Sequence, residues 1–274
     1  MKNVLGSTLL ASLLWFLVSP PAHAVDIEPM RLEQSLRAGT TYSGSFELTN
    51  MSSFFAEIAI ATDEYRYIFS EGTIPPPEGK KALPSCRTWL TFEKTNANLN
   101  PGESCTVNFL IKVPADAREE HLCAVLFDEK RGHEEAPPAS EAGSVRVHLT
   151  PRVSIPVYIS IQEAQKIAAE ITAVEVSAGP KKQSADFNIT VKNTGTVHIR
   201  PLGTLVIFDE KGEVAKNIPT GKPLPIFAGY SEVIPVGCPS LGAGTYTAVV
   251  TMELSRDTII QKKIGFVKKG GKTE

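Results

Sequence analysis

The strictest pattern in this chain is the alternation of apolar and polar residues between positions 145 and 161. Successive side chains of a β-strand point to opposite faces, so this pattern predicts a long strand with one buried face. Pro151 and Pro156 cannot donate ladder hydrogen bonds, which places part of the strand at the edge of a sheet. The apolar positions used below are Val147, Leu149, Val153, Ile155 and Val157.

This strand has two interpretations. It can be the last strand of its own sandwich, continuing into a linker. Its edge can also pair with a strand supplied by a partner protein, in the manner of β-strand addition. The alternation alone fits both.

Shorter period-two runs recur through the rest of the chain, separated by turn sequences such as 100–102 and 193–195. Strands at such short intervals predict an all-β protein of antiparallel sandwiches. The chain has 274 residues, enough for about two domains. We therefore expect two immunoglobulin-like β-sandwich domains in tandem, at 25–161 and 162–274. The single short helical candidate, 162–169, is interpreted as the linker. The predicted strands are 43–49, 104–113, 121–127, 145–161, 187–191, 203–209 and 244–254.

The first 24 residues have the pattern of a secretory signal peptide. A basic start at Lys2 is followed by an apolar run over 4–18 and by Ala22-His23-Ala24. Cleavage after Ala24 would start the mature chain at Val25. The apolar run is short for a membrane span of about 20 residues, so a retained anchor is the less favoured alternative. We expect a periplasmic protein without a stable membrane anchor.

The four cysteines suit an exported protein, in which disulfides persist. They form no CxxC pair, which argues against zinc. Cys86, Cys105 and Cys123 lie in the first half and Cys238 in the second. One bridge fits within the first half unless Cys238 reaches across. We favour Cys86–Cys123, with free buried thiols as the alternative.

Two connections and one tyrosine complete the residue-based expectations. The charged, Pro/Ala-rich segment 128–143 is expected to be a mobile loop, and the Pro-rich segment 73–84 an exposed connection. Tyr246 follows a glycine at the start of a predicted strand, a placement similar to the tyrosine corner of immunoglobulin-type sandwiches.

Enzyme signatures are lacking in the sequence. No two carboxylates stand out as a glycosidase pair, and no Gly-x-Ser-x-Gly or glycine-rich phosphate loop is present. The histidines are isolated from one another. The formal net charge is −2, which gives no strong field to attract nucleic acid. We expect a binding protein with no catalytic activity, no cofactor, no metal and no nucleic-acid partner.

Several motifs of the first domain occur in an order similar to that of a known family. They are Met30-Arg31-Leu32, Phe46-Glu47-Leu48-Thr49-Asn50, Leu99-Asn100-Pro101-Gly102-Glu103, Ile111-Lys112-Val113-Pro114 and Arg152-Val153-Ser154-Ile155. On these motifs the first domain resembles the N-terminal domain of periplasmic pilus chaperones. The second domain resembles immunoglobulin-like domains of bacterial two-domain cell-surface proteins, on Asn193-Thr194-Gly195, residues 198–203 and 209–212, and Gly244-Thr245-Tyr246.

The chaperone resemblance implies a binding site. In that family a basic residue on the first strand and another on the last strand line a cleft and bind the terminal carboxylate of a subunit. The matching positions here are Arg31 and Arg152. Arginine suits this role because its planar fork grips a carboxylate through two hydrogen bonds.

Two functions follow from these expectations. The leading hypothesis is a periplasmic chaperone or assembly factor that captures a secreted or surface subunit through the edge strand of its first domain. Its apolar residues Val147, Leu149, Val153, Ile155 and Val157 would fill a groove in the subunit. The alternative is a non-catalytic structural or adhesive module of a cell-envelope complex.

Overall fold

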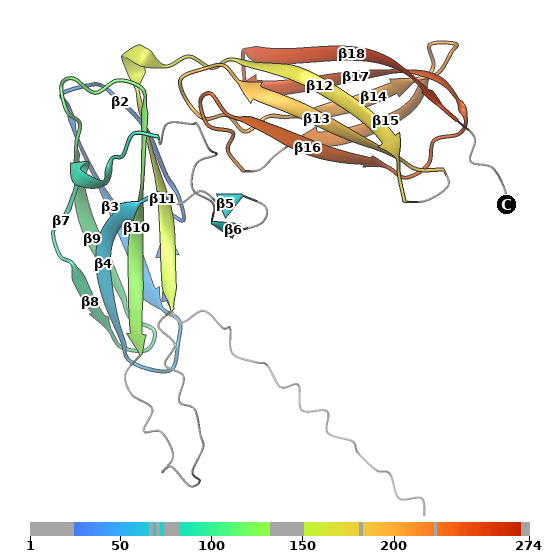
Figure 1. The fold of residues 1–274 in the computed structure, drawn as a ribbon. Helices are drawn as coiled ribbons and strands as arrows, with labels where there is room; N and C mark the ends of the chain where they lie inside the picture. Colours follow the sequence, from blue (N-terminus) through green and yellow to red (C-terminus); the bar gives the residue numbers. More distant parts are fainter. Residues whose placement is uncertain are drawn as a thin grey trace, which may run out of the picture.

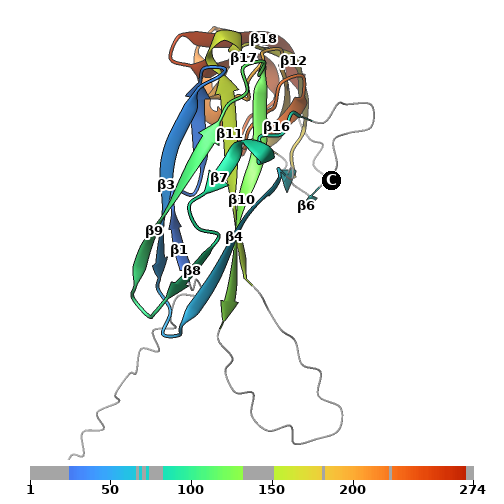
Figure 2. The same ribbon diagram turned by 90° about the vertical axis from the view of Figure 1, so that its left-hand side faces the viewer.

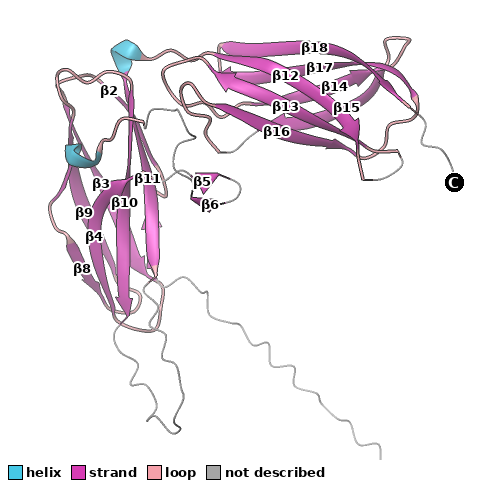
Figure 3. Cartoon of the chain, in the orientation of Figure 1, coloured by secondary structure: helices cyan, strands magenta, loops and turns pink. Residues whose placement is uncertain are grey.

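The chain folds into two β-sandwiches that meet at an angle (Figure 1). The structure is a computed structural model and describes residues 25–65, 68–69, 72–73, 83–131, 151–180, 183–221 and 224–269. Strands dominate both halves, and the helical elements are the short 3-10 turns η1 (Arg87–Trp89) and η2 (Gln162–Ala164) (Figure 3). The fold class predicted from the sequence is confirmed.

The first sandwich packs a four-stranded sheet against a five-stranded sheet. The first sheet has the order β1 (Val25–Glu28), β3 (Thr41–Asn50), β9 (Ser104–Lys112) and β7 (Leu90–Phe92). The second has the order β2 (Leu32–Leu36), β11 (Arg152–Ile161), β10 (Glu120–Arg131), β4 (Ala56–Glu64) and β8 (Asn96–Leu99). The core between them includes Phe46, whose ring lies 5.1 Å from that of Phe109 and 5.4 Å from that of Phe127.

The chain crosses between these two sheets near its start (Figure 2). β1 pairs with β3 in an antiparallel register, from Val25 opposite Asn50 to Glu28 opposite Glu47. After Pro29 and Met30 the chain joins the other sheet as β2, which pairs in parallel with the end of β11. The crossing closes one side of the sandwich with two short strands in place of one long strand.

The second sandwich packs a three-stranded sheet against a four-stranded sheet. The first has the order β12 (Ala169–Ala178), β13 (Ala185–Asn193) and β16 (Ser231–Cys238). The second has the order β15 (Val214–Gly221), β14 (Leu202–Phe208), β17 (Gly244–Ser255) and β18 (Thr258–Lys268). A separate two-stranded hairpin joins β5 (Ile68–Phe69) and β6 (Gly72–Thr73).

Each sandwich contains a fully buried asparagine at the end of a long strand. The Asn50 side chain, at the end of β3, donates to the carbonyl oxygens of Phe54 and Leu99 at 2.7 and 3.0 Å. Asn193, at the end of β13, donates to the carbonyl oxygens of Val197 and Ile226, both at 2.8 Å. An asparagine side chain at an equivalent position therefore joins an equivalent pair of connections in each domain.

Several local predictions made from the sequence can be compared directly with the structure. The hydroxyl of Tyr246 donates to the carbonyl oxygen of Gly242 at 3.2 Å, which is the hydrogen bond of a tyrosine corner. The predicted loop is wrong for residues 128–131, because β10 continues to Arg131 and pairs with β4 as far as Ala56. Residues 74–82 and 132–150 lie outside the described part of the chain, as does the predicted signal peptide at 1–24.

Candidate functional site: the β11 edge and the domain junction

β11 is paired differently along its two halves. On one side, residues 152–160 pair with β10. On the other side, residues 157–161 pair with β2, from Val157 opposite Leu32 to Ile161 opposite Leu36. Among the described residues, no strand pairs with that second side over residues 152–156. This stretch, which we call the open half of β11, is a sheet edge of about 16 Å.

The apolar side chains of β11 face the core of their own domain. Ile155 and Val157 are fully buried, and Val153 packs half-buried against the same core. The expectation that these side chains fill a groove in a subunit is therefore corrected for Ile155 and Val157, because their own sandwich already encloses them. Val147 and Leu149 lie outside the described residues.

Arg152, the first residue of β11, lies at the exposed end of the open half. Its guanidinium holds the carboxylate of Asp128 through two hydrogen bonds, one of them from Nη2 to Oδ2 at 2.8 Å. The two residues are cross-strand partners on β10 and β11. The hydrogen bonds from Arg152 lower the pKa of Asp128 and raise that of Arg152. The Arg152 guanidinium, which the sequence predicts to bind the terminal carboxylate of a partner, is therefore already hydrogen-bonded to the carboxylate of Asp128.

Arg31 lies at the crossing between β1 and β2. Its Nε is 3.2 Å from the Glu33 carboxylate. Since Leu32 pairs with Val157, Arg31 is level with the end of the open half, roughly four residues or about 13 Å along the strand from Arg152. The structure therefore places the two arginines at opposite ends of one edge, each on a different carboxylate, and does not form a two-arginine cradle.

Glu33 connects this edge to the second domain. Its carboxylate lies 2.6 Å from Nη1 of Arg200 and 3.3 Å from Nε2 of His198. The buried carboxylate of Glu120 accepts hydrogen bonds from the backbone N–H of His198 at 2.8 Å and from its ring Nδ1 at 2.6 Å. Two carboxylates of the first domain thus hold one loop of the second domain.

Aromatic side chains fill the rest of the junction. The Tyr158 ring, on the outer face of β11, lies 4.6 Å from the His198 ring and 5.2 Å from the Arg200 guanidinium carbon. Its hydroxyl is 3.1 Å from that of Tyr65. Burial raises the pKa of both tyrosines. Tyr158 and Leu122 pack into the apolar cluster of the second domain, so β11 belongs to both cores.

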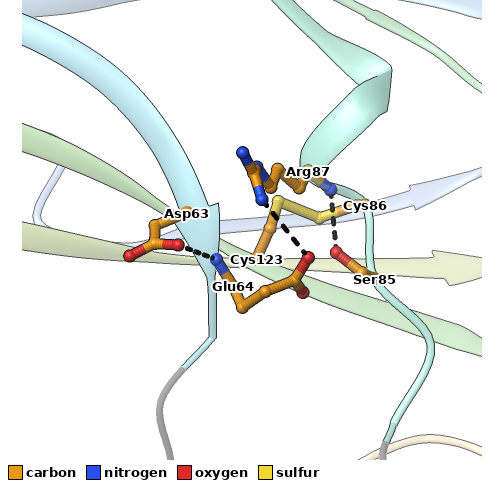
Figure 4. The surroundings of a disulfide bond; sticks show 6 residues. All are labelled: Asp63, Glu64, Ser85, Cys86, Arg87 and Cys123. Atoms are coloured by element: carbon orange, nitrogen blue, oxygen red, sulfur yellow. Dashed lines mark hydrogen bonds and ion pairs between the residues drawn. A yellow bond between two sulfur atoms is a disulfide. The ribbon is translucent and has the colours of Figure 1, made fainter.

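A disulfide joins Cys86 to Cys123, as favoured from the sequence (Figure 4). Both cysteines are fully buried, and their Cα atoms are 5.3 Å apart. Cys123 is the cross-strand neighbour of Val157, so the bond ties the segment before η1 to the strand beside β11. Over it, Arg87 approaches the Glu64 carboxylate at 4.0 Å. Cys105 and Cys238 are free thiols.

The described residues contain no group of three or more His, Cys, Asp or Glu side chains arranged to hold a metal ion. No helix among them has the length and apolar character needed to cross a membrane.

Comparison with known proteins gives structural similarities alone. No family model matches the chain, and no curated protein matches its sequence. Among solved structures, the class 5 fimbrial chaperone CfaA aligns with 87% of this chain and 98% of its own, at 15% identity and a TM-score of 0.44. The chain resembles fimbrial chaperones in fold. The Pseudomonas aeruginosa chaperone CupB2 covers 88% of this chain and 99% of its own, at 12% identity and a TM-score of 0.41.

A third example is the E. coli chaperone DraB, which covers 89% of this chain and 97% of its own, at 12% identity and a TM-score of 0.41. The resemblance of the second domain to cell-surface proteins stays an expectation.

The sequence pattern did not reveal the carboxylates that engage the two arginines. Asp128 lies within a segment interpreted as a loop, and Glu33 follows the motif without being part of it. Asp128 stands 24 residues before Arg152. The apolar run 121–127 gives no signal that the strand continues to Asp128, because charged residues follow it directly.

Proposed function

We propose that this protein is a periplasmic chaperone or assembly factor that binds a secreted protein subunit along the open half of β11. The observation that supports this most directly is the change of pairing at Val157, where β2 begins to cover the strand. An extended segment of a partner could take the same side over residues 152–156 and continue the sheet through backbone hydrogen bonds.

The burial of Ile155 and Val157 changes how such a partner would be held. The backbone of the open half supplies the hydrogen bonds, while the outward side chains of Arg152 and Ser154 are exposed to the partner. A terminal carboxylate binding at Arg152 would replace Asp128 as the acceptor. We propose Arg31, at the other end of the open half, as a second contact.

Photo-crosslinking from single positions tests this proposal. The exported protein would carry a photoreactive phenylalanine analogue at Ser154, on the open half, or at Thr106, exposed in the middle of the opposite sheet. Mass spectrometry would identify the crosslinked proteins. We expect a defined exported subunit at position 154 and none at 106. Arg31→Ala and Arg152→Ala should each reduce that product, because a charge-assisted hydrogen bond contributes about 1.5–3 kcal/mol.

Equal crosslinking at both positions would contradict binding through the edge. An unchanged yield in both arginine variants would refute the assigned contacts while leaving the edge itself. If position 154 gives no product although the protein remains in a stable envelope complex, the adhesive or structural module becomes the better function.

A further inference from the structure

The carboxylate of Glu33 is shared by basic side chains of both domains. Its Oε1 atom lies 2.6 Å from Nη1 of Arg200, 3.2 Å from Nε of Arg31 and 3.3 Å from Nε2 of His198. Arg31 and Glu33 stand on either side of the buried Leu32, so their side chains leave the strand in the same direction. One carboxylate oxygen therefore serves the partner-binding edge through Arg31 and the second domain through Arg200.

The contact with Arg200 is the stronger of the two arginine contacts. The Arg200 side chain is 21% exposed, against 52% for Arg31, so water screens its attraction to the carboxylate less. Its guanidinium also lies over the Tyr158 ring, and its Nη1 is 2.6 Å from Nε2 of His198. Because a guanidinium can only donate, we assign Nε2 of His198 as the acceptor and Nδ1 as the donor to Glu120. Arg200 is thus held in place by groups other than Glu33.

The second arginine of the edge shows what happens without such competition. Arg152 binds Asp128 through two hydrogen bonds, and among the described residues no other basic side chain reaches that carboxylate. Between the two described residues Arg31 and Glu33 the contact is one ion pair, from Nε to Oε1 at 3.2 Å. The difference follows the direction of the Glu33 carboxylate, which is drawn toward the second domain.

We propose that Arg200 is a positioning residue for Arg31. By holding the Glu33 carboxylate at the junction, Arg200 keeps it from gripping Arg31 at two points. The Arg31 guanidinium then stays available for an acidic group of the subunit. This inference rests on the proposed function for that acidic group, and it gives the second domain a part in binding at the open half of β11.

Chemical modification of Arg31 tests the positioning without any subunit. Phenylglyoxal reacts with guanidinium groups, and a two-point contact with a carboxylate slows the reaction. Mass spectrometry of peptides from the exported protein would give the rate at Arg31 in wild type and in Arg200→Gln. We expect about fivefold slower modification in Arg200→Gln, because Glu33 then forms a full ion pair with Arg31. Arg152 should react at the same rate in both proteins.

A second change at Glu33 separates positioning from general damage to the junction. Glu33→Gln removes the competing charge, so the double variant Arg200→Gln/Glu33→Gln should modify Arg31 at least as fast as wild type. A junction that was merely loosened by the loss of Arg200 would not be restored by a further change within it. Circular dichroism would verify that all variants are folded.

The photo-crosslink at position 154 extends the test to the subunit. Its yield should fall in Arg200→Gln and recover in the double variant. In an Arg31→Ala protein, Arg200→Gln should have no further effect, since both changes act through the same guanidinium.

An equal rate of Arg31 modification in wild type and Arg200→Gln would overturn the inference. A double variant as slow as Arg200→Gln would overturn it as well. The expected rates without a crosslinked subunit in any of the proteins would support the positioning by Arg200 and count against the proposed function.

Discussion

Asp128 and Arg152 form an ion pair that remains largely in contact with water. The side chain of Arg152 is 55% exposed and that of Asp128 28% exposed. The hydrogen bonds from Arg152 nevertheless lower the pKa of the carboxyl group. The pair therefore holds Asp128 ionised over a wider pH range while contributing little to the stability of the fold.

We predict that replacing Arg152 by Gln returns the pKa of Asp128 toward about 3.9. Because the folded-state pKa is lowered, the stabilisation is complete above the unfolded value and is lost as the pH falls through the folded value. Carboxyl-carbon NMR titration of wild type and Arg152→Gln measures this shift. The same titration of Asp128 in Arg31→Ala provides the control and should match wild type. An identical Asp128 titration in the Arg152 variant would contradict the pairing.

The two buried asparagines show how short side chains hold connections in place. Asn50 and Asn193 each satisfy two backbone carbonyl oxygens from connections far apart in sequence. Their loss would remove one hydrogen bond from each of these carbonyl oxygens. Those of Phe54 and Ile226 keep a second donor, in the Ser52 hydroxyl and the Ile199 N–H. A buried carbonyl left without a partner costs about 1–3 kcal/mol.

We predict that Asn50→Ala and Asn193→Ala each lower the free energy of unfolding by about 1–3 kcal/mol. Asn96→Ala is the matched control, because Asn96 is exposed on β8, and it should change stability by less than about 0.5 kcal/mol. Chemical denaturation followed by tryptophan fluorescence and circular dichroism gives both values. Equal effects of Asn50→Ala and Asn96→Ala would show that the Asn50 side chain does not support the fold.

The alternation of β11 predicted its buried face correctly but not its hydrogen-bonding neighbours. Side-chain periodicity reports which residues face the core, and Ile155 and Val157 lie there. The backbone N–H and C=O groups point sideways, in the plane of the sheet, and leave no trace in the side-chain pattern. For this reason the partial cover by β2, which defines the open half, could not be derived from the alternation.

The domain junction was also beyond sequence reasoning, for a physical reason. Glu33, Glu120, His198 and Arg200 are ordinary surface residue types within their own domains. They become paired because the second domain docks there, and Glu120 becomes buried. Hydrogen bonds such as the one between His198 and Glu120 span 78 residues. The fold class, in contrast, followed from local patterns. The positions of the four cysteines favoured the observed disulfide but left free thiols as an alternative.

We predict that Glu120→Ala uncouples the two domains. The change removes both acceptors of His198 and leaves its backbone N–H buried without that partner. A buried donor left without its acceptor costs about 1–3 kcal/mol. Differential scanning calorimetry should show one transition in wild type and two in the variant, and small-angle scattering should show a larger radius of gyration.

The control for the junction is Glu47→Ala, which removes an exposed carboxylate from β3, away from the second domain. It should keep the wild-type calorimetric profile and scattering curve. If Glu120→Ala also kept both, the carboxylate would not govern how the domains are joined.

The complete burial of Cys86 and Cys123 restricts when their disulfide can form during folding. An oxidising enzyme must touch a thiol to transfer a disulfide, and neither sulfur is accessible once β10 and the segment before η1 have packed together. Oxidation must therefore precede the final collapse of the first domain. A chain that folds in a reducing compartment would enclose both thiols and miss this opportunity, so the bond forms only where the cysteines meet an oxidant before the domain has folded.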